Sequence, residues 1–203
     1  MYSTLTQDFA ERAEALIATG SRANLLYAAL EIRLGVEARL QSYVQASDEV
    51  SDALKRGWEI PKLFKGLEKT FSNSSQVVEF VVSASGNDSV IMHFIPVSSR
   101  LRNYAARFGA ALHFTAVSHS SDEWWSSLEA SLVDALRDLH VCAKATLLGV
   151  PLRSKETGEV LTKFEFHNSD PRFDLMQRLA GSRELHQFKV TYLATDDYYA
   201  SAR

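Results

Sequence analysis

The chain has 203 residues, a formal charge of −3 and a pI of about 6.1, and 46% of its residues are hydrophobic. These values fit a globular protein with a sizeable core, and they argue against a surface built throughout for nucleic acid. The single cysteine, Cys142, excludes an intrachain disulfide, and no stretch reaches the roughly 18 apolar residues of a membrane span. Residues 1–12 are polar and carry acidic side chains, so no signal peptide is expected. We therefore predict a cytoplasmic protein without membrane partners.

The longest helical pattern covers residues 21–45 and organises the first half of the chain. Apolar residues recur there at steps of three and four, which is the spacing of one helix face. Gly20 is a helix stop and Ser21 an N-cap, so an earlier helix over residues 4–19 should lie antiparallel to the long one. A shorter helix is expected to begin at Pro61.

The hydrophobic period changes at Gln76, where two apolar strands flank a turn at residues 86–88 and predict a β-hairpin. Two helices should follow, and then three strands. The last of these strands places three large side chains on one side: Phe188, Val190 and Tyr192. The tail over residues 196–203 is expected to fray.

This order of elements predicts an α+β fold, in which a long-helix bundle packs on an antiparallel sheet of about five strands. No repeat or linker divides the sequence, so we expect one domain over residues 1–203. Its parts are a helical part at 4–71, the hairpin at 76–96, helices at 98–143 and C-terminal strands at 145–194.

Signatures of metal, cofactor and nucleotide chemistry are missing from the sequence. None of the six histidines belongs to an HExxH pattern, and glycine-rich phosphate-binding loops do not occur. A G-x-S-x-G nucleophile motif is also absent, and Cys142 has the surroundings of a small buried hydrophobe. We predict no cofactor and no metal.

One spacing supports a catalytic hypothesis. Arg107 and His113 bracket RFGAALH, an Arg-x5-His in helical surroundings. Through this motif and the helix-rich residues 4–143, the chain resembles the HEPN superfamily of helical, usually dimeric proteins. The resemblance implies a metal-independent ribonuclease in which His113 exchanges protons with a ribose 2′-hydroxyl and Arg107 stabilises phosphate charge. It also implies a prokaryotic defence or toxin–antitoxin setting. The alternative is that Arg107 is a surface cation and His113 a partly buried helix residue.

Two further groups are candidate contact residues. Arg100, Arg102 and Asn103 form the most basic local patch, which would either bind the phosphates of an RNA or be a solvated helix face. Trp124 and Trp125 are adjacent, and two adjacent helical side chains point in different directions. One of them is therefore a candidate for a protein interface, as is Tyr43 on the long helix.

Three functions follow from these patterns. The preferred one is a protein-interaction or assembly module that forms a homodimer or docks another protein. The second is the HEPN-like ribonuclease, with RNA as its substrate. The third is a small-molecule sensor with a pocket against the hairpin, lined by Phe80, Met92 and Phe94.

Overall fold

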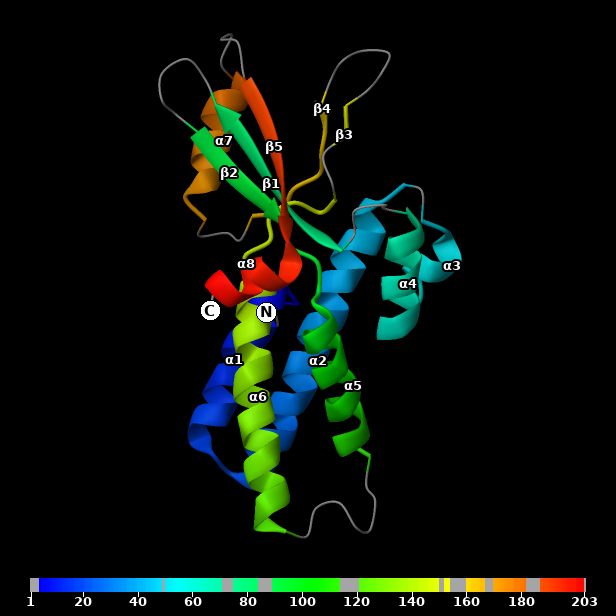
Figure 1. The fold of residues 1–203 in the computed structure, drawn as a ribbon, viewed down its shortest axis with the longest axis vertical. Helices are drawn as coiled ribbons and strands as arrows, with labels where there is room; N and C mark the ends of the chain where they lie inside the picture. Colours follow the sequence, from blue (N-terminus) through cyan, green and yellow to red (C-terminus); the bar gives the residue numbers. More distant parts are fainter. Residues whose placement is uncertain are drawn as a thin grey trace.

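The structure is a computed structural model that describes residues 4–48, 50–70, 75–83, 89–113, 121–149, 152–153, 160–166, 170–181 and 187–202. It is an α+β protein with helices at one end and a sheet at the other (Figure 1). The helices are α1 (Thr6–Thr19), α2 (Arg22–Ala46), α3 (Asp52–Lys55), α4 (Ile60–Thr70), α5 (Ser99–Ala111), α6 (Asp122–Ala143), α7 (Arg172–Gly181) and α8 (Thr195–Ser201). The strands are β1 (Gln76–Ser83), β2 (Ser89–Phe94), β3 (Leu152–Arg153), β4 (Val160–Leu161) and β5 (Gln187–Ala194).

The long helix α2 is the centre of the bundle, and α1, α4, α5 and α6 all pack against it. The predicted boundary between α1 and α2 is confirmed. Gly20 ends α1 in the left-handed conformation (φ 66°), and the Ser21 side chain accepts a hydrogen bond from the Asn24 amide. Gly35 lets three helices approach closely, because a Cβ there would lie 2.9 Å from a Leu139 methyl and 3.1 Å from the Phe9 Cβ.

The prediction of about five strands in one sheet is wrong. Among the described residues the main sheet has three antiparallel strands in the order β2-β1-β5, and β3 pairs with β4 separately. The segment after β4 does not add a strand to the main sheet and is bonded to other parts of the chain. Lys163 bonds to the Ala46 carbonyl at the end of α2, and the Glu165 amide bonds to the Thr146 carbonyl. Phe164 keeps only a single bridge, to Leu147.

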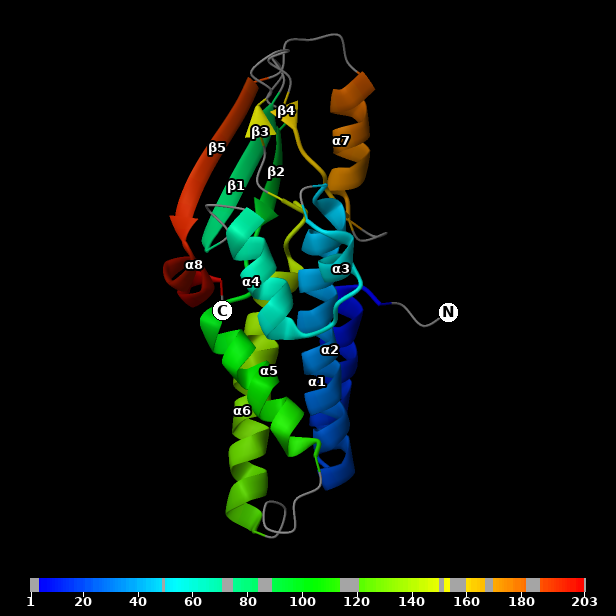
Figure 2. The same cartoon turned by 90° about the vertical axis from the view of Figure 1, so that its right-hand side faces the viewer.

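One face of the sheet belongs to the core. Val78, Phe80 and Val82 of β1 lie opposite Phe94, Met92 and Val90 of β2, and all six are at most 3% exposed. Helix α7 contacts β2, one edge strand of the sheet. In Figure 2 it lies to the right of the sheet, whereas β5, the other edge strand, lies at the left. The residues expected to line a sensor pocket are therefore core residues, and Phe94 packs against Tyr43 with ring centroids 4.7 Å apart.

Two tyrosines join the sheet to the bundle at the connection between β2 and α5. Tyr43 donates to the Ile95 carbonyl (2.7 Å), and Tyr199 donates to the Pro96 carbonyl (2.9 Å). The expectation of a frayed tail is wrong, because residues 195–201 form α8 and Tyr199 is only 2% exposed. The buried apolar side chains of both ends form one cluster. No helix in the described part of the chain is long and apolar enough to span a membrane.

Candidate functional site

The candidate site is the outer edge of the three-stranded sheet. Strand β5 pairs with β1 along its whole length, from Gln76↔Ala194 to Ser83↔Gln187, and it is the last strand of the described sheet on that side. The backbone groups that point away from β1 are therefore available to another strand, because each strand residue offers hydrogen bonds to one neighbour only.

Three large side chains along β5 share the face that is buried on β1. Phe188 is 52% exposed, Val190 39% and Tyr192 46%, whereas their partners Val82, Phe80 and Val78 are buried. Phe188 also stacks on Phe80, with centroids 5.9 Å apart and planes 3° from parallel. We call these three residues the β5 stripe. An exposed apolar row on an open strand edge is the usual feature of a pairing surface.

No other row of exposed apolar side chains lies on an edge strand in the described part of the chain; Ile91, 43% exposed on the other edge strand β2, is a single residue. Tyr27 and Leu30 lie one turn apart on α2, where the helix satisfies its own backbone. Trp58, 64% exposed, lies between α3 and α4 outside any strand. Isolated residues of this kind are normal on monomers.

The predicted catalytic pair lies at the end of α5. Arg107 and His113 are both exposed, and His113 follows the last helical residue, Ala111. The Arg107 guanidinium carbon is 5.9 Å from the centre of the Tyr104 ring. Figures 1 and 2 both place this end of α5 far from the sheet, so the β5 stripe and the Arg-x5-His motif belong to different regions.

The three residues predicted to contact nucleic acid have different environments. Arg100 forms two hydrogen bonds to the fully buried Asp138 (Nε–Oδ2 2.8 Å and Nη2–Oδ1 2.6 Å), which raise its pKa. Arg102 lies over the Phe64 ring at 3.3 Å, and burial lowers its pKa. Asn103 is exposed. The structure thus gives Arg100 and Arg102 intramolecular contacts and leaves Asn103 at the surface.

The three predicted interface residues, Tyr43, Trp124 and Trp125, do not form one surface. Tyr43 is 1% exposed and belongs to the core, so it offers no surface to a partner. Trp124 and Trp125 are half-buried and pack edge to face, with centroids 4.9 Å apart. The Arg22 guanidinium lies 5.4 Å from the Trp125 ring. These two rings stabilise the contact between the starts of α2 and α6.

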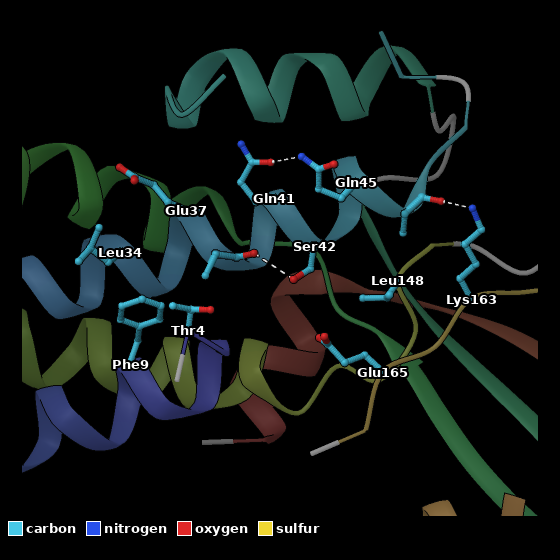
Figure 3. Close-up of a pocket in the computed structure, with 12 residues that line it drawn as sticks. Thr4, Phe9, Leu34, Glu37, Gln41, Ser42, Gln45, Leu148, Lys163 and Glu165 are labelled. Atoms are coloured by element: carbon cyan, nitrogen blue, oxygen red, sulfur yellow. Dashed lines mark hydrogen bonds between the residues drawn. The ribbon is translucent and has the colours of Figure 1, made fainter. Parts of the chain in front are cut away.

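Polar residues line an open groove of about 740 Å³ beside α2, shown in Figure 3. Two of its three charged side chains have partners in the protein: Lys163 pairs with Asp48 (2.9 Å), and Glu37 with Arg33 (3.2 Å). Burial raises the pKa of Glu37, although Arg33 opposes this effect. Across the described ranges, no three His, Cys, Asp or Glu side chains lie close enough together to hold a metal ion.

The sequence predicted that Phe188, Val190 and Tyr192 lie on one side of the last strand, but it did not indicate that this side is exposed. Their exposure depends on β5 being an edge strand, which no local pattern encodes. Comparison with known proteins adds no assignment: no protein-family profile, curated protein or solved structure matches the chain.

Proposed function

We propose that the chain is a protein-interaction module that self-associates by pairing β5 with the β5 of a second copy. The observation that supports this proposal is the β5 stripe, three large apolar side chains exposed along an edge strand. Antiparallel pairing across a two-fold axis would join two three-stranded sheets into one continuous sheet and satisfy the open backbone edges.

The sequence of β5 favours one register. A two-fold axis at Val190 places Phe188 opposite Tyr192 of the second copy and Lys189 opposite Thr191, so that four of the five central residues meet a residue of their own kind across the axis and Val190 meets Val190. The polar–apolar pair of this register, Gln187 opposite Leu193, lies at its ends. An axis at Lys189 would place two like charges opposite each other, and an axis at Thr191 would place Lys189 opposite Leu193.

The expected affinity is moderate. Burying the exposed half of a large apolar side chain contributes about 1 kcal/mol, and the interface would contain six such side chains together with new backbone hydrogen bonds. Association costs at least about 4 kcal/mol of translational and rotational freedom. These terms leave a small net gain, which corresponds to a reversible dimer whose population depends on concentration.

Sedimentation equilibrium of the wild type, Val190→Lys and Ile91→Lys tests this proposal. Val190→Lys would place two lysines opposite each other at the two-fold axis and should give a monomer. Ile91 is a matched control, because it is similarly exposed (43%) but lies on β2, at the other edge of the sheet. Ile91→Lys should keep the dimer. A monomeric wild type at every concentration, or equal effects of the two variants, would contradict the proposal.

The HEPN-like ribonuclease is the second candidate function. The exposure of both Arg107 and His113 favours it, since either side chain could reach an RNA strand. A β5-mediated dimer would leave the two motifs distant from its interface, so this function would need another pairing surface. RNA cleavage in EDTA that disappears in both His113→Ala and Arg107→Ala would support the ribonuclease, and an inactive wild type would not.

A further inference from the structure

The open groove beside α2 contains one charged side chain without an opposite charge next to it. Three charged side chains line the groove, and two of them are paired, Lys163 with Asp48 and Glu37 with Arg33. The third is Glu165, which is half-buried. Within the described residues, no cationic group lies at ion-pair distance from its carboxylate. A partly buried carboxylate loses hydration, so a counter-charge is usually found beside it.

The cations around Glu165 do not supply that counter-charge. The Lys163 ammonium donates to the Ala46 carbonyl (2.6 Å), and Figure 3 shows it directed away from the Glu165 carboxylate, which points into the groove. Behind Glu165 lies a second pocket, whose lining includes Arg172, and this guanidinium binds Asp170 through Nε and Nη2. Neither of the other two cations in that lining is at ion-pair distance from Glu165: Arg39 and Lys144. The position beside the Glu165 carboxylate is therefore open to a cationic ligand.

The polar side chains of α2 in the groove direct donors to acceptors of the protein itself. The Gln41 amide donates to the Gly57 carbonyl, and the Gln45 amide donates to the Gln41 Oε1 atom (3.2 Å). The Ser42 hydroxyl donates to the Ala38 carbonyl (3.1 Å), as Figure 3 shows. A hydroxyl has a single hydrogen, so Ser42 Oγ can only accept a hydrogen bond from a ligand. Together with the Glu165 carboxylate, this oxygen favours a ligand that donates hydrogen bonds.

Much of the remaining lining is hydrocarbon. The apolar side chains that line the groove come from α1, from α2 and from the segment after α6: Phe9, Leu34, Ala38, Ala46 and Leu148. The volume of about 740 Å³ is much larger than a single ion needs, and the described residues contain no group of three metal ligands. The lining therefore suits a ligand that combines a cationic head with a hydrocarbon stem.

We propose that this groove binds a small aliphatic amine, with its ammonium group held by the Glu165 carboxylate and Ser42 Oγ and its alkyl stem on Leu34 and Ala38. An ammonium group carries three donors and no acceptor, which matches a carboxylate and a hydroxyl oxygen that can only accept. The amine would supply the missing counter-charge of Glu165. This proposal is independent of the pairing of β5, because no β5 residue lines the groove.

The test is a titration of the ¹⁵N-labelled protein at neutral pH and constant ionic strength with pentylamine, 1-pentanol and pentanoate in separate series. The three probes share a similar alkyl stem, but their head groups are cationic, neutral and anionic. We expect saturable shifts of the Ser42, Leu148 and Glu165 amide resonances with pentylamine. The same resonances should not saturate with 1-pentanol or pentanoate over the same concentrations, because neither supplies a positive charge to Glu165.

Matched variants make the outcome decisive. Glu165→Gln keeps the shape of the side chain but removes its charge, and should weaken pentylamine binding by about tenfold or more. Glu129→Gln removes the same charge from an exposed position of α6 outside the groove, and should leave the affinity unchanged. Should Glu165→Gln fail to fold, Ala38→Lys decides, because a fixed ammonium in the groove should weaken binding to a similar extent. No saturable shift with pentylamine, an equal response to 1-pentanol, or an unchanged affinity in Glu165→Gln or Ala38→Lys would overturn the proposal.

Discussion

At the helical end, α2 is surrounded by four other helices, and its backbone groups are satisfied within the helix itself. At the sheet end, β1 is flanked on both sides, whereas β5 has a partner on one side and exposes the β5 stripe. The two ends differ in whether a second chain could complete them. This difference is why we propose an interaction surface on the sheet and not on the helix that dominates the sequence.

The C-terminal helix α8 packs between the helical end and the sheet end through Tyr199. Removing the Tyr199 side chain should change the free energy of unfolding more than any other substitution considered below. Tyr199→Ala deletes a 2% exposed ring and its hydrogen bond to Pro96, so it should lower the free energy of unfolding by about 4 kcal/mol. Tyr27→Ala is the control, because Tyr27 is 59% exposed and should change stability by less than about 0.5 kcal/mol. Urea denaturation measures both; a small effect of Tyr199→Ala would mean that α8 does not stabilise the junction.

Within the helical end, a buried pair can be compared with an exposed one. Arg100→Met leaves Asp138, which is fully buried, without its bidentate partner, and should cost about 3 kcal/mol. Arg137 pairs with Asp134 at 3.1 Å at the surface, so Arg137→Met should cost less than about 1 kcal/mol. Equal losses in thermal or urea unfolding would show that the Arg100–Asp138 pair has no special structural role. That result would return Arg100 to the candidates for phosphate binding.

The smallest expected effect is at the sheet end and concerns how the free energy of unfolding depends on pH. Burial lowers the pKa of His93, with Glu79 opposing the shift and Arg172 adding to it. The folded protein then binds this proton less tightly than the unfolded chain, whose histidine pKa is about 6.5. The contribution of His93 is fully present above pH 6.5 and is lost as the pH falls from there through the lowered pKa. His93→Gln should flatten the dependence of unfolding free energy on pH in that window, and an unchanged slope would contradict this assignment.

The parts of the fold that local patterns determine were predictable. Gly20 and Ser21 mark helix ends through their own backbone geometry and hydrogen bonds, and the apolar period identifies α2 without any tertiary information. The hairpin of β1 and β2 was predictable for the same reason, because its strands are neighbours in the sequence.

The assembly of distant segments was not predictable. Strand β5 reaches β1 across most of the chain, and residues 162–166 are bonded to the end of α2 and to Thr146, outside the main sheet. The burial of Tyr199 depends on where the last helix, α8, packs. The sequence does not predict this position, because the neighbouring residues Asp196 and Asp197 are polar and indicate an exposed segment. Among the candidate site residues, Arg100 forms a hydrogen bond to Asp138, a charged residue within the apolar stripe of α6. The sequence shows that Asp138 interrupts this stripe, but it does not identify Arg100 as the partner of Asp138.

A disulfide across the proposed two-fold axis tests the central claim most directly. Cys142 is the only cysteine and is fully buried, so Val190→Cys gives a chain with a single reactive thiol. Residues opposite each other in an antiparallel pair have Cα atoms about 4.5–5.5 Å apart, within the range that a disulfide bridges. We predict that Val190→Cys forms a covalent dimer under mild oxidation, much faster than the control Ile91→Cys on the opposite edge. Equal rates for the two variants, or no covalent dimer of Val190→Cys, would contradict self-association through β5.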